Sequence, residues 1–518
     1  MGLTSFEGTD DENKSLRTGK GRNGYKRMDA EAISDLPEEE LHIREIQSNR
    51  SNNYVLACAI FASLNSILLG YDVGVMSGAI LFMKEDLNLT EVQEEVLVGC
   101  LSILSLFGSL AGGKTSDIIG RKWTMALAAI VFQAGAAVMT FASSFQTLLL
   151  GRFLAGIGIG FGVMVAPVYI AEISPTVARG SLTSFPEIFI NLGILLGYIS
   201  NYAFSNLSLH TGWRVMLAVG ILPSVVIIFA LIFIPESPRW LVLRNRIDAA
   251  RLVLSKTIEN STEVEQRLTE IQKAAELHIT GKPIWKEILH PSLCLRRMLI
   301  AGIGIHCFQQ VTGIDATVYY SPEILKSAGI KDKSKLLAAT VGVGLSKTGF
   351  IMIAILLVDR MGRKPLLYVS TIGMTCCLVV LGMTLSVLKG TRVGVVMAVV
   401  VICANVAFFS IGIGPICWVI SSEIYPLRVR AQAAALGAVG NRVCSGLVAI
   451  SFLSVARIMS VGGTFLMFSA ISALSVWFVY KCVPETKGKS LEEIEILFKN
   501  EASSIQLGDH VHLVRDHI

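Results

Sequence analysis

The sequence predicts an all-α membrane protein with twelve transmembrane helices arranged in two six-helix halves. Of its 518 residues, 52% are hydrophobic and only 16% are charged, whereas soluble domains carry about 25% charged residues. Apolar stretches recur from residue 54 to residue 482, and each is long enough for a helix that needs about 20 residues to cross a bilayer. Charged motifs of the first half also return in the second. Only helices satisfy their backbone polar groups within such segments, so we expect a helix bundle.

Six apolar segments fill each half of the chain, between breaks marked by charged residues, glycine or proline. Those of the first half lie near 54–78, 96–113, 123–143, 148–170, 182–204 and 214–234. Those of the second lie near 298–320, 336–358, 366–388, 393–420, 431–455 and 463–483. We therefore expect a first half over residues 54–240 and a second over 298–487.

The remaining segments are polar. Residues 1–53 lack the basic-then-apolar pattern of a signal peptide and are predicted to be a disordered cytoplasmic tail, and residues 488–518 a cytoplasmic C-terminal tail. Residues 241–297 are charged, with apolar positions at helical spacing such as Leu252, Val253 and Leu268. They predict surface helices that link the two halves on the cytoplasmic side.

Lysine and arginine gather in alternate loops, around Arg121, in the central linker, around Arg363 and after Glu423. If the helices alternate in direction, these loops share one face, which the positive-inside rule makes cytoplasmic. The net charge of +5 is therefore interpreted as a signal of orientation, and no nucleic-acid patch is expected.

The two halves repeat each other in charged motifs. The first motif, Asp117-x-x-Gly120-Arg121-Lys122, corresponds to Asp359-x-x-Gly362-Arg363-Lys364 in the second half. The second, Glu172-x-x-Pro175 with Arg179, corresponds to Glu423-x-x-Pro426 with Arg430. The third, Pro235-Glu236-Ser237, corresponds to Pro484-Glu485-Thr486. Parallel six-helix repeats are typical of transporters that bind substrate between the halves. Exposed ion pairs contribute under about 1 kcal/mol each, so only a network of these charges is expected to clamp the cytoplasmic face.

Further motifs extend this pattern along the chain. They are Gly70-Tyr71-Asp72, Gly151-Arg152-Phe153, Pro235 through Arg239, Gln309-Gln310-Val311-Thr312-Gly313-Ile314-Asp315 and Gly414-Pro415-Ile416-Cys417-Trp418. In this order they resemble the sugar porter family of the major facilitator superfamily, from about residue 53 to residue 493. Ser184-Phe185-Pro186-Glu187, Gly313-Ile314-Asp315 and Lys347 resemble plant polyol and monosaccharide transporters.

The resemblance implies proton symport of linear polyols, inositol or monosaccharides by alternating access, with the proton as the coupling ion and no other cofactor. It also implies a multi-pass protein of the plasma membrane, the vacuolar membrane being the alternative, with both termini cytoplasmic. The carrier is expected to function as a monomer. A uniporter of the same fold is the nearest alternative, and a non-transporting sugar sensor is a more distant one.

Ionisable residues within apolar segments need partners or a wet cavity, because burying an ion at membrane depth costs about 2.5 kcal/mol or more. Asp72 and Arg152 meet this description. In the proton symporters that this sequence resembles, the equivalent acid takes up the proton and the arginine pairs with it. For Arg152 and Lys347 the alternative is a position near a helix end from which the side chain snorkels to water.

Substrate-binding candidates follow from hydrogen-bonding chemistry and from the resemblance. Gln309 and Gln310 carry amides, which both donate and accept hydrogen bonds, as hydroxyl groups do. Many sugar porters have Gln and Asn where this sequence has Glu187 and Asp315, a change that favours linear polyols over strict pyranose selectivity. Lys347 is expected to neutralise one of these acids, and an internal salt bridge without ligand contact is the alternative. The resemblance adds Trp418 and Asn441 to the binding site and Tyr319 and Tyr320 as an outer gate.

Other functional classes are disfavoured. The ten cysteines show no CxxC or Cys/His spacing, so no metal is expected. Residues 108–115 match GxxxxGK[ST], but this stretch closes an apolar segment instead of joining a strand to a helix. We therefore expect neither an enzyme nor a channel, since no charged ring or filter-like loop is present.

Overall fold

The computed structural model describes residues 38–175, 182–258, 260–280, 284–426, 429–487, 493–494 and 498. Their side chains are described except for those of residues 38–52, 274–280, 284–286, 359, 422 and 431. Every regular element within these ranges is helical.

The helices fall into three groups along the chain. The first half holds α2 (Glu38–Asp86), α3 (Glu91–Ile119), α4 (Arg121–Thr140), α5 (Phe145–Ile173), α7 (Phe185–Ala203), α8 (Leu209–Val219) and α9 (Ile221–Phe233). The link holds α10 (Pro238–Leu243), α11 (Ile247–Thr257), α12 (Ser261–Thr280) and α13 (Ile284–Leu289). The second half holds α14 (Leu293–Val311), α15 (Ile314–Tyr319), α16 (Ser321–Ala328), α17 (Lys333–Met361), α18 (Arg363–Val387), α19 (Arg392–Ile411), α20 (Ile413–Glu423) and α21 (Arg430–Cys482).

Twelve membrane crossings fit this arrangement, as the apolar pattern predicts. Within the described residues, nine helical spans are long and apolar enough to cross a membrane. The last of them contains two crossings, since α21 merges two helices across a kink at Ser460. The other two crossings are α7, a 19-residue helix that carries polar residues such as Glu187, Asn191 and Asn201, and the broken rod α14–α16.

The break in the α14–α16 rod occurs at Gly313, which has a φ of 84°. A side chain is strained in this left-handed conformation. A Cβ atom there would also lie 2.6 Å from the ring of Phe468. Gly313 thus lets α14 end and α15 begin with a change of direction at the level of Gln309, Gln310 and Asp315.

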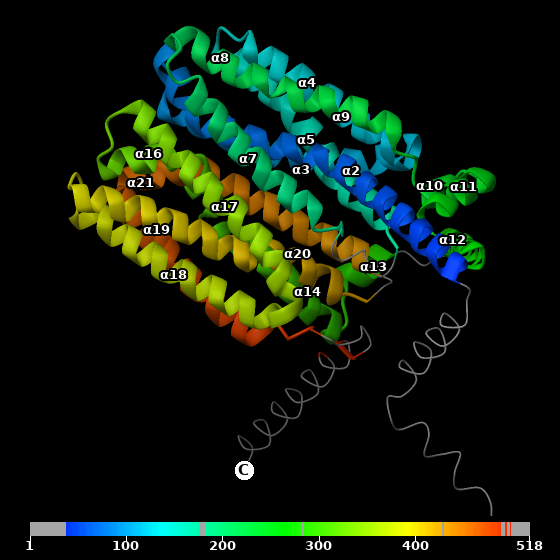
Figure 1. Cartoon of the computed structure of the whole chain (residues 1–518). Helices are drawn as coiled ribbons and strands as arrows, with labels where there is room; N and C mark the ends of the chain where they lie inside the picture. Colours follow the sequence, from blue (N-terminus) through cyan, green and yellow to red (C-terminus); the bar gives the residue numbers. More distant parts are fainter. Residues whose placement is uncertain are drawn as a thin grey trace, which may run out of the picture.

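Figure 1 shows the two halves side by side, with α2–α9 in blue to green and α14–α21 in green to red. Between the halves, α3 packs against α21 and α7 packs against α17. Helices α10–α12 lie at one end of the bundle around a small apolar core that includes Val253, Val264 and Leu268. Leu252, which the helical spacing groups with them, is exposed.

Candidate functional site

A buried ion pair lies inside the first half. Asp72 on α2 and Arg152 on α5 are 2% and 0% exposed, and Arg152 Nη1 donates to Asp72 Oδ2 at 2.5 Å. Arg152 is anchored on α3, because its Nε donates to the carbonyl of Leu97 at 2.8 Å and its Nη2 to that of Val98 at 3.4 Å. The arginine therefore does not snorkel, and a change at Asp72 acts on three helices.

Amide side chains join three helices of the second half. Gln309 on α14 donates to the carbonyl of Gly414 on α20 at 2.8 Å, and Asn441 on α21 donates to Gln309 Oε1 at 2.5 Å. Gln310 Nε2 lies 3.2 Å from Asn441 Oδ1. With its amide turned over, Gln310 donates instead to Asp315 Oδ2 at 2.9 Å. The predicted amides thus form one cluster beside the break at Gly313.

Asp315 joins this cluster to the first half. It lies in the first turn of α15, and Ser445 on α21 donates a hydrogen bond to its Oδ2 atom. The hydroxyls of Ser445 and Ser102 on α3 are 2.9 Å apart, across the boundary between the halves. Asp315 is therefore connected through Ser445 to the contact between α3 and α21.

Among the described side chains, Lys347 forms no salt bridge with either Glu187 or Asp315. Lys347 is 7% exposed, and its Nζ lies 5.7 Å from the ring centroid of Phe409. Among the side chains that the structure describes, neither Glu187 nor Lys347 has an oppositely charged partner within 4.0 Å. The charges acting on the Glu187 carboxylate come from Lys347, Arg442 and Asp315. These four groups make a charged region with balanced formal charge.

Sequence reasoning missed Arg442 of this region. It also missed Ser445, which donates to Asp315, and His306, which contacts Trp418. Arg442 follows Asn441 within an apolar segment, so the criterion that selected Asp72 applied to it as well. His306 Nε2 lies 2.8 Å from the Ser421 hydroxyl, and its ring meets that of Trp418 edge-on with centroids 4.6 Å apart. Trp418 is 39% exposed, so its indole keeps an accessible face.

The end of the bundle where α2 ends and α3 begins is closed by bonds between the halves, and we call it the closed end. Lys333 and Glu85 are 2.7 Å apart, and Arg457 pairs with Glu91. Ser454 donates from its backbone N–H and its hydroxyl to Glu95, each at 2.6 Å.

The predicted outer-gate tyrosines lie just inside this end. Tyr319 and Tyr320 are both buried, and the Tyr320 hydroxyl donates to the carbonyl of Ala449 at 2.9 Å. Nearby, Tyr198 of the first half donates to the carbonyl of Val318 at 2.7 Å.

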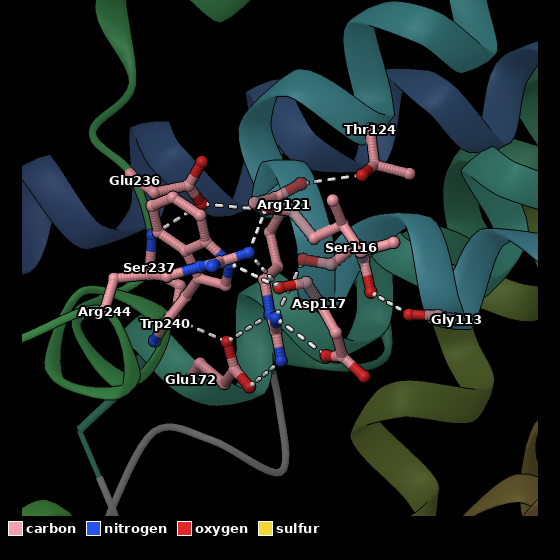
Figure 2. A network of polar contacts seen from close by, with 12 residues as sticks. Gly113, Ser116, Asp117, Arg121, Thr124, Glu172, Glu236, Ser237, Trp240 and Arg244 are labelled. Atoms are coloured by element: carbon pink, nitrogen blue, oxygen red, sulfur yellow. Dashed lines mark hydrogen bonds and ion pairs between the residues drawn. The ribbon is translucent and has the colours of Figure 1, made fainter.

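At the opposite end, which we call the Arg121 end, the first charged motif forms a network (Figure 2). Arg121 is buried and pairs with both carboxylate oxygens of Glu172, at 3.1 and 3.2 Å, and with Asp117 at 3.1 Å. Gly120, which immediately precedes α4, has a φ of 99°, and a Cβ there would collide with the Glu236 carboxylate. Burial raises the pKa of Glu236, although backbone N–H groups donate to it.

The second half repeats this network. Arg363 pairs with Glu423 at 2.9 Å, and Glu485 accepts from the backbone N–H groups of Arg363 and Lys364 at 3.1 and 2.9 Å. Burial opposes ionisation of Glu485, but the backbone donors together lower its pKa. Arg430 donates to the carbonyl of Tyr425.

The bonds of these two networks that are named above each stay within one half. Arg179 and the side chain of Asp359 lie outside the described residues. A clamp between the halves at this end therefore remains a prediction for another conformation.

Replacing Arg121 by Ala is expected to destabilise the protein by about 3–5 kcal/mol, because it leaves the Glu172 carboxylate without its bidentate partner. Thermal unfolding of the purified carrier in detergent measures the change. Arg251→Ala removes an exposed pair with Glu265 on the linker and should leave the midpoint unchanged. Equal midpoints for the parent and Arg121→Ala would contradict the structural role of this network.

Comparisons with known proteins agree with these features. The family profile described as "Sugar (and other) transporter" matches residues 58–498. The chain is 65% identical over 508 residues to probable polyol transporter 4 of Arabidopsis thaliana, covering 97% of this chain and 96% of the relative. It is 49% identical to polyol transporter 5 of the same plant, covering 87% of each.

Among solved structures, the fold matches the proton:xylose symporter XylE bound to 6-bromo-6-deoxy-D-glucose, with a TM-score of 0.73 and 28% identity. The match covers 86% of this chain and 100% of that chain. The inward open conformation of XylE from E. coli matches with a TM-score of 0.72 and 29% identity, covering 86% and 100%.

Proposed function

Because this chain belongs to the sugar transporter family and is an integral multi-pass membrane protein, we propose that it moves linear polyols and monosaccharides together with a proton. The observation that carries this proposal is the buried Asp72–Arg152 pair in one half together with the cluster of bonded amides in the other. Relatives described as polyol transporters and a structural neighbour described as a proton symporter support it.

The proton acts at the Asp72–Arg152 pair. When Asp72 takes up a proton, its charge no longer holds Arg152, and the guanidinium keeps only its carbonyl acceptors on α3. The contact between α2, α3 and α5 then loses its strongest bond. Protonation thereby biases which way the first half tilts against the second.

The substrate binds at the amide cluster and the charged region of Glu187, Lys347 and Arg442. A linear polyol presents a hydroxyl on every carbon, so it matches carboxylates that accept O–H donors and amides that do both. Gln310 and Asp315 bind each other in one amide orientation, so a hydroxyl has to replace that bond. The Ser445–Ser102 contact relays the change to the first half.

The closed end faces the outside of the cell and the Arg121 end faces the cytoplasm in this proposal. The basic motifs at the Arg121 end support this orientation through the positive-inside rule. The bonds between the halves at the closed end support an inward-facing state. The proposal also assigns the carrier to the plasma membrane and has it act as a monomer. Tyr319 and Tyr320 then form part of its outer gate.

Uptake in a transporter-deficient cell tests this function. Sorbitol, inositol, xylose and glucose are supplied with and without a protonophore while substrate-induced current is recorded. A proton symporter accumulates at least one of these solutes uphill, carries inward current and loses accumulation with the protonophore. Uptake that is saturable but never uphill, with no current, would support the uniporter instead.

Replacing Glu187 by Gln is expected to shift the ratio of polyol to pyranose uptake by about tenfold, since a hydrogen bond to a charged group contributes about 1.5–3 kcal/mol. The amide keeps the size of the side chain but removes one acceptor and the charge. The measurement is the uptake efficiency of sorbitol relative to glucose. Glu265→Gln on the exposed linker is the control, and an unchanged ranking in Glu187→Gln would refute contact with the solute.

A further inference from the structure

Asn65 is a buried amide for which the described residues offer no partner. It lies on α2, is 1% exposed, and neither its Nδ2 nor its Oδ1 has a hydrogen-bond partner among the protein atoms described. Buried amides in folded proteins are almost always bonded, to protein or to ordered water. An amide that is sealed from lipid and bonded to no protein group is a site for buried water.

Asn65 lies on the same side of α2 as Asp72 and Cys58. Cys58, Asn65 and Asp72 are spaced seven residues apart, which is about two helical turns and a rise of about 10 Å for each step. Residues with this spacing lie on nearly the same side of a helix. The protonatable Asp72, the unpartnered amide and the Cys58 thiol thus form one line along α2.

Helix α5 provides the facing residues in antiparallel order. Arg152 pairs with Asp72, and a Cβ at Gly162 would lie 3.4 Å from Cβ and Oδ1 of Asn65. One step further, the Cys58 thiol lies near the hydroxyl of Tyr169. We call this line of facing residues the α2–α5 seam. Because Gly162 has no side chain, a methyl-sized group fits beside the Asn65 amide.

The far end of the seam reaches the charged network at the Arg121 end. The Tyr169 hydroxyl donates to the carbonyl of Pro235 at 2.9 Å. The next residue is Glu236, whose carboxylate accepts from the backbone N–H of Arg121 at 2.8 Å. Polar groups therefore run from the buried ion pair to the loop between α9 and α10, without passing through the amide cluster.

We propose that the α2–α5 seam is the route by which the proton leaves Asp72, with waters held at Asn65 as its central relay. The inference rests on the proposed proton coupling. Protonated Asp72 gives its proton to a water in the seam and becomes the carboxylate that pairs again with Arg152. The proton passes along the waters and is released as hydronium at the Arg121 end, so only O–H bonds break and form. Solute and proton then leave by separate routes.

Asn65→Leu in the full-length carrier tests the route, because net uptake depends on proton release whereas solute exchange does not. Net uptake requires the proton to leave in each cycle, whereas exchange of labelled for unlabelled solute uses the loaded carrier, which keeps its proton. Positioned proton transfer contributes a factor of about a hundred or more, so substrate-induced current and net uptake should fall at least about tenfold. Exchange should stay close to the parent rate.

A second variant covers the case in which leucine disturbs folding. Gly162→Ala adds one methyl group at ordinary van der Waals distance from Asn65 and suits a helix, yet it occupies the space beside the amide. It should lower net uptake more than exchange. Asn65→Ser keeps a hydroxyl that binds water and should recover most of the current. Ser63→Ala is the matched control, since the Ser63 hydroxyl is bonded within its own helix at 2.7 Å.

Three results would overturn the proposal. Unchanged current in Asn65→Leu and Gly162→Ala would mean that the proton leaves through the central cleft. An equal loss of exchange and net uptake would mean that Asn65 serves packing alone. If the parent carrier moves solute but shows no current at all, the proton coupling itself is refuted, and the route with it.

Discussion

Asp72→Asn is expected to abolish uphill accumulation while leaving downhill flux and solute exchange. Asparagine keeps the shape of the side chain and an oxygen that accepts from Arg152, but it cannot take up a proton at neutral pH. One pH unit across the membrane corresponds to about 1.4 kcal/mol, or tenfold accumulation with one coupled proton. With a gradient of about two units, accumulation should therefore fall from as much as about a hundredfold to none.

The pH dependence of uptake gives an independent readout of the same variant. In the parent carrier, acidifying the outside should raise the rate because protonation of Asp72 is needed before the loaded carrier reorients. In Asp72→Asn the rate of downhill flux should not vary with outside pH. Asp248→Asn on the linker removes a fully exposed carboxylate and serves as the control. Persistent concentrative uptake by Asp72→Asn would disprove its role as the proton acceptor.

The general architecture could be predicted because it depends on length and polarity alone. Twelve apolar stretches were visible between charged breaks, and Asp72, Arg152 and Gln309 stood out as ions or amides within them. Asn441 was predicted only from the resemblance to sugar porters. Arg442 carried the same signal but was not selected. Asn65 was less visible, since one amide in an apolar helix indicates a site only when its lack of partners is known.

The charged repeats identified the residues of the Arg121 end but not how they pair. Sequence proximity grouped Glu172 with Arg179 and Glu423 with Arg430. In the structure Glu172 pairs with Arg121, and Glu423 pairs with Arg363. Ion pairs form between helices that lie side by side, and such neighbours are set by tertiary packing, which a repeated motif does not encode.

The bonds of the closed end were not predicted for a related reason. Glu95 stands next to Glu94 at the start of an apolar segment, where a carboxylate is usually interpreted as a solvated helix end. Both are buried, yet they bind different halves. Lys84 pairs with Glu94 within the first half, whereas Ser454 of the second half donates to Glu95. Whether a carboxylate at this place stabilises one half or joins the two therefore depends on a difference of one position along α3.

Glu95→Gln is therefore expected to open the closed end, whereas Glu94→Gln is not. The Glu95 carboxylate accepts two hydrogen bonds from Ser454, at its backbone N–H and its hydroxyl. The amide of glutamine accepts only through its oxygen and turns an NH₂ group toward the other donor. Losing a hydrogen bond to a charged group costs about 1.5–3 kcal/mol, which shifts the population between states by at least about tenfold.

Distances between two spin labels measure that shift. Val92 on α3 and Ile458 on α21 are 62% and 83% exposed and lie beside the bonds that close this end. If about 1% of the parent carrier is open, a tenfold shift raises the longer-distance population to about 10% in Glu95→Gln. The same distribution in both glutamine variants would contradict a latch at Glu95. Glu94 is equally buried but is bonded within one half, so Glu94→Gln is the matched control. A shift confined to Glu95→Gln would therefore mean that bonds between the halves stabilise the closed end.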